Sequence, residues 1–593
     1  MLIRILRLLD PSERRRLALL APLVFLAAGM EIVGVSAVIP FVTLLAEPAA
    51  VFDLPVVGPL AARSGIEDAG TLLRYAGLGL TLAVLAMNTV VVVTRYRQHQ
   101  FSMGLIAAMS TRLLRHYLAQ PYSFTLTRNT GDLTNLVVRE VERVSSGVNA
   151  GLGLLTNAVT ISALLAFLVM LDPLLALTSF AVLGTLYGAV FLGTRRYLTR
   201  TSRESVRLGA ERIKAVNEAL GGFKELKVAG REGAALRHYA RPSQRYAEIR
   251  AVVMAIATLP RYALEAIAVG GVVMVASLMA GREGTFAATL PLLGAYVFAA
   301  LRLIPAMQYL FSHFALLRSV QGSVESLEAD LAQLSDLVDT QEEPPQPLPF
   351  DRTITLQGVD FRYPAGEDVA LHGIDLTLQK GRSLAIVGRT GSGKTTLVNV
   401  LLGLLEPASG NVAVDATSVT SETRRAYRRL FGYVPQDIFL SDDSVSRNVA
   451  LGMPDDEIDD EAVRRACQQA QVDDFVEREL PSGYGTVVGE RGVRLSGGQR
   501  QRIGIARALY HQPAVLVFDE ATSALDVHTE RLVFDALDAI ARERTLVMIA
   551  HRLDTVAKAD HVLVLDAGRV VDEGPPDAVL ARYRQPLVGR DGE

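Results

Sequence analysis

The feature that most constrains this chain is a series of long apolar stretches in its first 320 residues. A helix needs about 20 mostly apolar residues to cross the hydrocarbon core of a bilayer, which is about 30 Å thick. A single such stretch is compatible with a buried helix of a soluble protein, but a series of them is not. The sequence therefore predicts an all-α domain of six transmembrane helices, at residues 17–46, 75–94, 144–171, 173–194, 251–281 and 284–317.

The basic residues of this half fall on one side of the predicted spans. Arginine and lysine are frequent before residue 17, between residues 95 and 143, and between residues 195 and 231. Because cytoplasmic segments of membrane proteins carry the excess of these residues, we expect all three segments to be cytoplasmic. An even number of spans then leaves both termini in the cytoplasm.

The two long basic segments have the periodicity of helices rather than the composition of loops. We therefore expect the membrane helices to continue past the bilayer and to turn back near residues 120–132 and near residues 221–233. Either these turns touch the cytoplasmic domain and transmit its motion, or they are solvated charged helices. The sequence leaves both readings open.

Composition limits the partners and the redox chemistry of the chain. Half of the residues are hydrophobic, 21% are charged, and the net charge of −3 gives no reason to expect a nucleic acid partner. Cys467 is the only cysteine, so no intrachain disulfide can form, and no base motif beside it indicates a nucleophile. The first apolar stretch is far longer than a signal-peptide core, which indicates a retained first helix.

A proline-rich segment marks a domain boundary. Residues 341–350 contain four prolines, which favour a stiff, extended connector over a helix or a central strand. After it, short β-branched runs alternate with helical stretches, as in an α/β domain. We therefore predict a transmembrane domain at residues 1–330, a linker at residues 331–350 and an α/β domain at residues 351–593.

A phosphate-binding loop opens the α/β domain. Residues 384–387 form a short apolar strand that leads into Gly-Arg-Thr-Gly-Ser-Gly-Lys-Thr, which matches the P-loop pattern. Glycines let backbone N–H groups surround phosphate oxygens, Lys394 neutralises the β- and γ-phosphates, and the Thr395 hydroxyl reaches Mg²⁺. The sequence predicts a P-loop ATPase with ATP and Mg²⁺ as ligands, and the ATP-binding residues here are Gly388, Arg389, Thr390, Gly391, Ser392, Gly393, Lys394, Thr395 and Thr396.

A second apolar strand at residues 515–518 ends in two carboxylates. It would deliver Asp519 to the metal ion and leave Glu520 as the general base that polarises the attacking water. The alternative is a pair of acidic residues that cap the following helix, which the upstream P-loop disfavours.

Between these motifs lies Leu-Ser-Gly-Gly-Gln-Arg-Gln-Arg at residues 495–502, and here the chain resembles the ATP-binding cassette (ABC) transporters over essentially its whole length. The family's signature motif matches Ser496, Gly497, Gly498 and Gln499. The resemblance implies that Gln436 senses Mg²⁺ and the γ-phosphate, that His551 contacts the γ-phosphate, and that Tyr363 stacks on adenine. It also implies that the loop at residues 523–526 crosses a dimer.

The same resemblance implies a dimer whose signature motifs each close over ATP held by the other subunit. One P-loop and one signature per chain would make two equivalent sites in a homodimer. A heterodimer stays open, although neither motif is degenerate in this chain.

Charged residues inside the predicted spans are costly and therefore point to cargo. Arg261 and Glu265 lie four residues apart on one helix face, and they form either an internal ion pair or part of a substrate site. Arg302 has no partner nearby in the sequence, so we expect it to meet either an anion of the cargo or Glu31. The candidate substrate residues are Arg302, Arg261 and Glu31.

Segments of the membrane half resemble those of bacterial lipid-linked oligosaccharide flippases. They are Gly-Met-Glu-Ile-Val-Gly at residues 29–34, Leu-Pro-Arg-Tyr-Ala-Leu-Glu at residues 259–265 and Leu-Arg-Leu-Ile-Pro at residues 301–305. The resemblance implies a bacterial inner membrane and an amphipathic glycolipid cargo with a diphosphate. A multidrug or lipid exporter is the alternative, and diverse apolar cations or lipids would stimulate its ATPase. An ATP-gated channel would instead conduct without a turnover-linked need for ATP.

Overall fold

The computed structural model of the chain describes residues 2–46, 69–128, 130–171, 173–279, 285–332, 345–363, 368–519, 544–550 and 556–583. Contacts divide the chain into two units. Unit 1 comprises Met1–Leu118 and Gly131–Ser335, and unit 2 comprises Ala119–Thr130 and Asp336–Glu593. The predicted domain boundaries at residues 330 and 350 stay a prediction.

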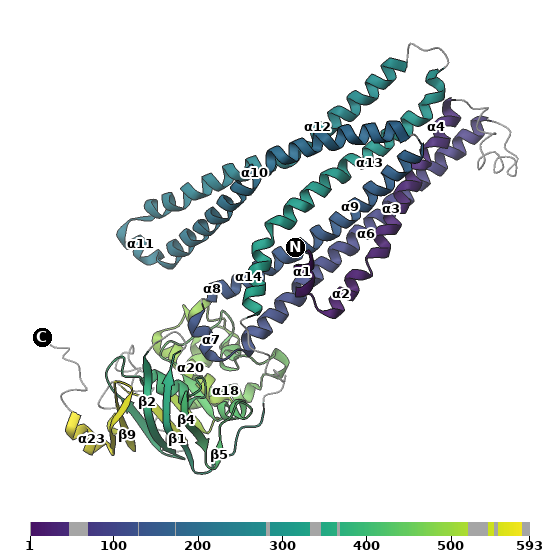
Figure 1. Cartoon of the computed structure of the whole chain (residues 1–593). Helices are drawn as coiled ribbons and strands as arrows, with labels where there is room; N and C mark the ends of the chain where they lie inside the picture. Colours follow the sequence, from purple (N-terminus) through teal and green to yellow (C-terminus); the bar gives the residue numbers. More distant parts are fainter. Residues whose placement is uncertain are drawn as a thin grey trace. The chain divides into compact units, whose positions relative to one another are not determined.

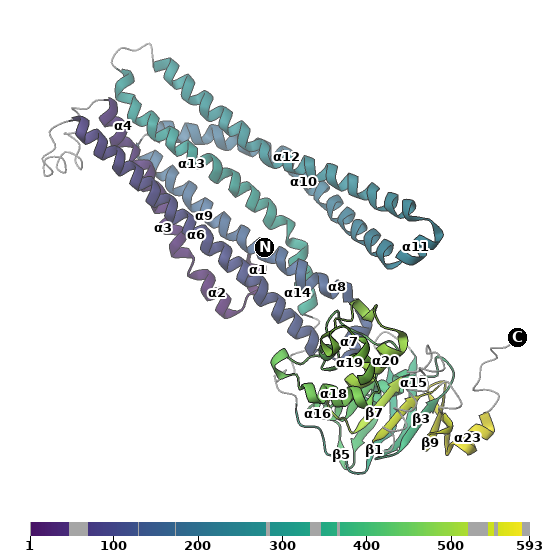
Figure 2. The ribbon, with the colours of Figure 1, turned by 180° about the vertical axis from the view of Figure 1, so that it is seen from behind.

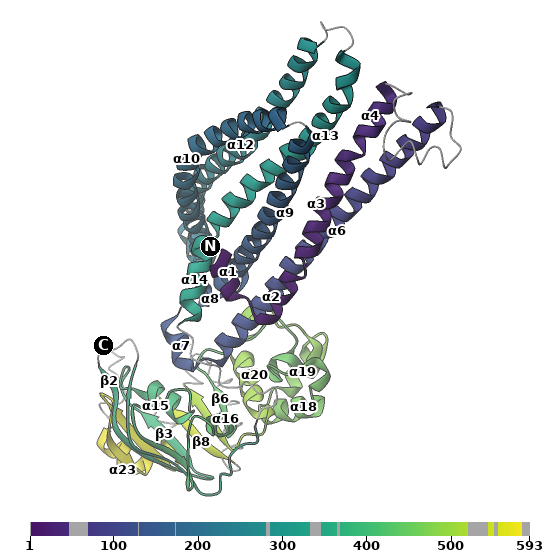
Figure 3. The same cartoon turned by 45° about the vertical axis from the view of Figure 1, so that its right-hand side comes forward.

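Unit 1 is built from helices (Figure 1). Within it, α9 packs against α13 and α10 packs against α12. Figure 3 shows both pairs running side by side. The helices are α1 (Leu2–Leu8), α2 (Pro11–Ala18), α3 (Ala21–Ser36), α4 (Val38–Ala46), α6 (Ala69–Ala119), α8 (Thr130–Asn135), the π-helical turn η2 (Leu136–Glu140), α9 (Val141–Leu171), α10 (Pro173–Gly221), α11 (Phe223–Ala229), α12 (Glu232–Met279), α13 (Thr285–Ser319) and α14 (Gln321–Leu331).

The helical membrane half is confirmed. Among the described residues, three helical stretches are long and apolar enough to cross a membrane, at residues 11–42, 70–119 and 131–171. They overlap the first three predicted spans. The fourth predicted span lies within α10, and the fifth and sixth coincide with parts of α12 and α13 to within two residues at their ends. The 51 residues of α6 extend well beyond a bilayer thickness, as the basic helical segments predicted.

The first predicted span falls on a helical stretch that is long enough to cross a membrane, but this stretch has two short interruptions. Helix α2 ends at Ala18, α3 begins at Ala21, and α3 and α4 are separated at Ala37. Two prolines explain these breaks, because proline has no N–H to donate to the carbonyl four residues earlier. Pro22 lies in the first turn of α3, where that loss is tolerated, and Pro40 follows the break at Ala37.

Both predicted turns between the long helices are confirmed as short helices. The first is α7 (Tyr122–Thr127), which belongs to unit 2 together with the α/β domain. The second is α11, which belongs to unit 1. Helix α11 (Phe223–Ala229) is capped by Gly230, whose φ of 62° allows the N–H groups of residues 230 and 231 to bond back to the carbonyls of Lys227 and Leu226.

Unit 2 contains two sheets. The antiparallel sheet has the order β2-β1-β4-β5, and the larger sheet has the order β10-β9-β3-β8-β7-β6, in which only the β9–β10 pair is antiparallel. The strands are β1 (Thr353–Arg362), β2 (Val369–Gln379), β3 (Ser383–Val387), β4 (Ser409–Val414), β5 (Thr417–Ser418), β6 (Phe431–Val434), β7 (Val515–Asp519), β8 (Thr545–Ile549), β9 (His561–Asp566) and β10 (Arg569–Gly574).

The helices of unit 2 gather mainly beside the larger sheet, and α18, α19 and α20 form a group at one side of the strands (Figure 2). Besides α7, the helices are α15 (Lys394–Leu401), α16 (Arg424–Arg428), α17 (Val445–Val449), α18 (Asp460–Gln469), α19 (Asp473–Glu479), α20 (Gly497–Tyr510) and α23 (Pro576–Tyr583).

Two apolar cores hold unit 2 together. One joins the antiparallel sheet, α15 and one face of the larger sheet, and it includes Ile354, Leu397 and Val517. The other joins the opposite face of that sheet to α18 and α20, and it includes Phe518 and Ile503. Every residue of β3, β7 and β8 is buried, as expected for parallel strands covered on both faces. This α/β architecture confirms the predicted fold class.

Candidate functional site: a phosphate-binding loop at the sheet edge

The P-loop connects β3 to α15, as predicted. The Lys394 side chain folds back into the loop, where its Nζ donates hydrogen bonds to the carbonyls of Gly388 (2.9 Å) and Arg389 (3.0 Å). Lys394 is only 7% exposed. An ammonium group fixed inside a loop of this kind is in place to neutralise the phosphates of a nucleotide.

Two glycines of the loop are required by close packing. A Cβ on Gly388 would lie 2.2 Å from the carbonyl oxygen of Leu565 in β9. Gly393 has a φ of 101°, and a Cβ there would lie 3.2 Å from the carbonyl oxygen of Ala370. The loop therefore takes a path that other residues cannot follow, with α15 beginning directly after it.

One buried atom of the loop fits a phosphate ligand. Ser392 is 4% exposed, and its Oγ makes no hydrogen bond within the described part of the chain. Buried hydroxyl groups normally have a partner, so this one has the chemistry to donate to a phosphate oxygen. Together with Lys394 and the N-terminus of α15, the residues present fit the nucleotide that the sequence predicts.

The sheet register brings Asp519 level with the P-loop. In the larger sheet, Asp519 of β7 is paired with Ile549 of β8, and Ile549 is paired with Ile386 of β3. Neighbouring strands are about 4.8 Å apart, so Asp519 ends its strand only two strands, about 10 Å, from the strand that enters the P-loop. Asp519 is buried, at 7% exposed.

A tyrosine that we had not assigned a role contacts this carboxylate. The Tyr433 hydroxyl, at the end of β6, donates a hydrogen bond to Asp519 Oδ2 at 3.2 Å. Burial, and then the neighbouring Asp519 carboxylate, raise the pKa of Tyr433 above its usual range, so the hydroxyl keeps its proton and remains a donor. The only signal in the sequence was its position three residues before Gln436.

We expect Tyr433→Phe to lower the ATPase rate about tenfold or more and to raise the Mg²⁺ concentration needed for half-maximal activity. The substitution removes a hydrogen bond to a charged group, a kind worth about 1.5–3 kcal/mol, which orients Asp519. Phosphate release measured over a Mg²⁺ titration checks both effects. Tyr510→Phe, which removes a hydroxyl bonded to the Asp459 N–H, is the matched control. An unchanged Mg²⁺ dependence in Tyr433→Phe would contradict the expectation.

Tyr363 lies next to the P-loop helix. Its hydroxyl shares a hydrogen bond with Thr396 Oγ1 (2.9 Å), and its ring stands edge-on to Phe361 with the centroids 5.0 Å apart. The half-buried ring is therefore held in place at the edge of the phosphate-binding region. The assignment of adenine stacking to Tyr363 stays a prediction.

The signature residues form the start of α20. Ser496 is the N-cap: its Oγ accepts a hydrogen bond from the Gln499 N–H (3.2 Å), and its own N–H donates to Gln499 Oε1 (2.8 Å). This capping box fixes the helix start. Ser496 and Gly497 are exposed, and Gly498 is buried.

Of the remaining predicted residues, some are described by the structure and others are not. Arg389, Thr390, Gly391 and Thr395 are exposed on the P-loop side of α15, and Gln436 is exposed two residues after β6. Glu520 and His551 lie outside the described residues, as does the loop at residues 523–526. Their assigned roles stay predictions, although Glu520 directly follows Asp519 and His551 directly follows Ala550, whose N–H bonds to Ile386.

A small polar cavity lies within unit 1. It has a volume of about 90 Å³ and is lined by residues of α3, α6, α9 and α13, among them Glu31, Arg95 and Arg302. Arg302 Nη2 donates a hydrogen bond to Asn88 Oδ1 at 3.0 Å. The Glu31 carboxylate accepts a hydrogen bond from Thr160, and it is close enough to Arg302 and Arg95 to interact electrostatically with both.

Arg302 therefore does have partners, and they come from other helices. Arg95 is a second cation that lines the cavity, and its guanidinium group lies over the ring of Tyr309, 5.0 Å from the centroid. The distribution of basic residues alone had placed Arg95 in a cytoplasmic segment. Glu31 Oε2 is buried without a hydrogen-bond partner among the described residues. Arg261 lies in α12, and its side chain is outside the described part of the chain.

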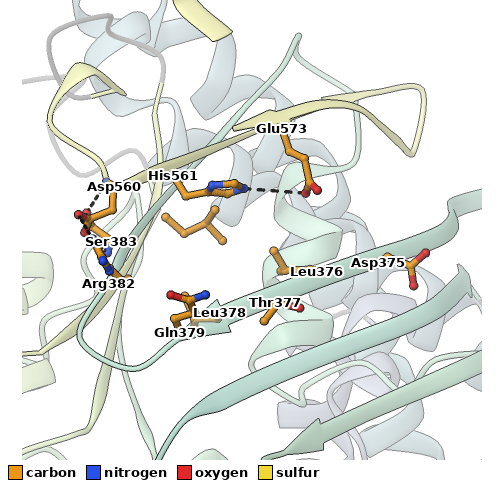
Figure 4. Close-up of a pocket in the computed structure, with 11 residues that line it drawn as sticks. Asp375, Leu376, Thr377, Leu378, Gln379, Arg382, Ser383, Asp560, His561 and Glu573 are labelled. Atoms are coloured by element: carbon orange, nitrogen blue, oxygen red, sulfur yellow. Dashed lines mark hydrogen bonds and ion pairs between the residues drawn. The ribbon is translucent and has the colours of Figure 1, made fainter. Parts of the chain in front are cut away.

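A larger hollow of about 360 Å³ lies on unit 2, between the outer edge of β2 and strands β9 and β10 (Figure 4). Asp560 holds one end through Arg382 (3.1 Å) and the backbone of Ser383 (2.8 Å), and His561 faces Glu573 across it. No residue of the P-loop lines this hollow, so it is separate from the predicted nucleotide site.

Two family models match the chain. The model described as ABC transporter matches residues 371–523, and the model described as ABC transporter transmembrane region matches residues 60–299. Each match covers one of the two kinds of structure described above: the α/β sheet domain with its P-loop, and the membrane helices.

Curated relatives match most of the chain. The "ATP-dependent lipid A-core flippase" of Chromohalobacter salexigens is 33% identical and covers 82% of this chain and 83% of its own length. The protein of the same name in Ralstonia nicotianae is 33% identical over 87% of both chains. The "Heterocyst differentiation ATP-binding protein HepA" of Nostoc sp. is 32% identical and covers 80% of this chain and 76% of its own length.

A solved structure has the same fold. The structure titled "Structure of a bacterial Atm1-family ABC exporter with ATP bound" superposes with a TM-score of 0.73 at 24% identity, and it covers 98% of this chain and all of its own. Membrane helices joined to a P-loop ATPase domain define an ATP-driven membrane transporter. The chain belongs to the ABC transporter family, and its ATPase activity is coupled to movement of substances across the membrane.

Proposed function

We propose that this chain flips an acidic glycolipid, specifically a lipid-linked oligosaccharide, across a bacterial inner membrane, with both termini in the cytoplasm. The observation that carries the proposal is the polar cavity of unit 1, where Arg302 and Arg95 lie among apolar membrane helices. Cations inside a membrane domain are costly and are retained where they meet an anion. The names of the 33% identical relatives support a glycolipid cargo.

The ATP site would combine the P-loop after β3 with residues at or beyond the ends of neighbouring strands of the larger sheet. Lys394 and the N–H groups of the P-loop bind phosphate oxygens, Ser392 Oγ supplies a further donor, and Tyr363 holds the adenine. Thr395, Gln436 and Asp519 would hold Mg²⁺, which neutralises charge on the phosphates when it is bound. Glu520 orients the attacking water, and His551 contacts the terminal phosphate.

The exposed signature residues support a dimer. Ser496 and Gly497 present the N-terminus of α20 at the surface of unit 2, where positive partial charge favours the phosphates of a nucleotide. We propose a homodimer in which each signature completes the ATP site of the other chain, because both motifs are intact in this one sequence.

A second candidate cargo is lipid A-core, which the printed names of the Chromohalobacter and Ralstonia relatives favour. Both candidates carry a lipid and a glycan, so the cavity alone does not distinguish them. Transport assays with each candidate, on the same preparation of the protein, distinguish them.

We expect ATP-dependent translocation of a lipid-linked oligosaccharide in proteoliposomes, and Arg302→Ala should reduce it about tenfold or more. Loss of a hydrogen bond between charged groups costs about 1.5–3 kcal/mol, which corresponds to at least tenfold in affinity. Glu520→Gln is the variant that cannot hydrolyse ATP. The measurement is the fraction of labelled glycan that becomes accessible across the bilayer.

Arg318→Ala is the matched control, because Arg318 is an exposed arginine on the same helix as Arg302 and does not line the cavity. It should leave translocation unchanged. Robust ATP hydrolysis with no movement of the oligosaccharide would reject this cargo, and movement of lipid A-core in the parallel assay would then identify the second candidate. Stimulation by diverse apolar cations would favour a multidrug exporter.

A further inference from the structure

The N-terminal segment of unit 1 is anchored by apolar side chains on its inner face. Ile5 and Leu9 are each 2% exposed, and α1 packs against α9 and α14. Burying two aliphatic side chains is worth about 1.5–3 kcal/mol each, so this short segment is held by packing and not by its helix propensity alone.

The charges on the inner face are neutralised by partners in other helices. Arg4 pairs with Glu325 (3.1 Å) and Glu328 (2.7 Å) of α14. From α6, Arg112 contacts the Asp10 carboxylate and donates to the carbonyl of Leu8 at 2.8 Å. All these inward-facing charges therefore have a counter-charge within unit 1.

The outer face carries four arginines of a different kind. Arg7, Arg14, Arg15 and Arg16 are exposed, and within the described ranges no carboxylate lies at ion-pair distance from any of them. The guanidinium group of Arg14 bonds only to the carbonyls of Leu9 (3.0 Å) and Arg7 (3.3 Å), which carry no net charge. The segment thus has two sets of charges: Arg4 and Asp10 are paired with residues of α14 and α6, and the four other arginines are exposed without a carboxylate partner in the described ranges.

Exposed apolar side chains flank these arginines. Ile3 is 69% exposed, Leu6 is 39% exposed, and Leu19 is 72% exposed. The stretch that is long and apolar enough to span a membrane covers residues 11–42, so this mixed surface lies at the end of a membrane span. Basic and aliphatic side chains together at a membrane boundary match a lipid headgroup layer above acyl chains.

We propose that this N-terminal basic surface, made of Ile3, Leu6, Arg7, Arg14, Arg15, Arg16 and Leu19, binds anionic phospholipids of the leaflet that surrounds it. The arginines contact the headgroup phosphates, and the three aliphatic side chains enter the acyl region. Continuity with a membrane span selects lipid over a soluble acidic protein as the occupant. The same segment is joined to α14 through Arg4 and to α6 through Arg112. Lipid that binds the segment would therefore also stabilise its contacts with the ends of these two helices.

The chain contains no tryptophan, which permits a test without background fluorescence. Leu6→Trp places one reporter within the surface, and Leu19→Trp places a second in case the first disturbs folding. The full-length protein is reconstituted into nanodiscs that contain either brominated phosphatidylglycerol or brominated phosphatidylcholine at the same mole fraction. Each basic residue near a charged membrane contributes about 1 kcal/mol, or about fivefold. We expect phosphatidylglycerol to occupy the site at least about fivefold more strongly, as measured by quenching.

The Arg7→Gln, Arg14→Gln, Arg15→Gln and Arg16→Gln quadruple variant should abolish this preference, and about 0.5 M salt should weaken it because the arginines are exposed. The control carries the same change of net charge at four exposed arginines of residues 231–250, namely Arg231→Gln, Arg237→Gln, Arg241→Gln and Arg250→Gln, and should keep the preference. Equal quenching by the two lipids at both reporters would overturn the proposal. A preference that survives in the quadruple variant would overturn it as well.

Discussion

Replacing Lys394 with alanine is expected to lower the ATPase rate by about 10²–10³-fold, the range seen when one preorganised electrostatic contact to a transition state is lost. The reason is geometric. The Lys394 ammonium is held inside the P-loop by two of the loop's own carbonyls, so it is already in place when a phosphate binds. Because it is 7% exposed, water screens it little. Phosphate release by the purified protein in nanodiscs measures the effect.

Lys380→Ala provides the control for a lost lysine. Lys380 is exposed in the turn after β2 and faces Asp351 at 4.0 Å, an exposed pair of the kind that contributes little. We expect its ATPase rate to stay within a factor of two of the unmodified protein. A Lys394→Ala protein that retains more than a tenth of its activity would show that the loop backbone alone is sufficient for phosphate binding.

Local sequence patterns predicted the elements around the ATP site well. The strand before the P-loop, the start of α15 at Lys394 and the strand ending at Asp519 all follow from short-range signals, because glycines, apolar runs and helix starts act over a few residues. The fold class and the turns at α7 and α11 followed from hydropathy and from helical periodicity in the same way.

Contacts between distant residues could not be predicted from these patterns. Arg302 meets Asn88 across 214 positions of sequence, and Tyr433 meets Asp519 across 86. No periodicity or motif encodes which helices are neighbours, so the sequence suggested Glu31 or an anion of the cargo, and not Asn88, as the partner of Arg302, and it gave Tyr433 no role. The break at Ala37, by contrast, could have been predicted from the sequence. Pro40 has no N–H to donate to the carbonyl four residues earlier, so a helix break near residue 37 was to be expected.

The arginines of the unit 1 cavity and of the N-terminal basic surface have different contacts, which the count of basic residues along the sequence could not distinguish. Counting arginines as cytoplasmic markers assigned Arg95 and Arg16 to the same category. Both arginines are exposed, but the structure separates them by contacts: Arg95 lines the cavity with Glu31 and lies over the ring of Tyr309, whereas Arg16 belongs to the N-terminal basic surface. Position in the fold, and not charge alone, decides what an arginine contacts.

Gly388→Ala is expected to destabilise the ATPase domain by about 3 kcal/mol or more and to weaken ATP binding at least tenfold. An added Cβ would lie 2.2 Å from the carbonyl oxygen of Leu565 and 2.6 Å from Ser392 Oγ. Strand β9 is paired with β3 from His561 to Val564, and Leu565 itself is paired with Val570 of β10, so its carbonyl can move only if this pairing is disturbed. Overpacking a core costs about 1–3 kcal/mol where side chains can adjust, and here the obstacle is backbone.

Gly391→Ala separates this clash from the general cost of losing a glycine. Gly391 has a φ of 81°, but nothing lies within 4 Å of its added Cβ, so we expect only the conformational cost of about 1–2 kcal/mol. Calorimetric melting of the full-length protein, with and without ATP, should therefore give a larger fall for Gly388→Ala and a smaller ATP-induced rise. Equal melting temperatures for the two variants would mean that β9 yields to the new methyl group, and that the close approach of the loop to Leu565 does not determine phosphate binding.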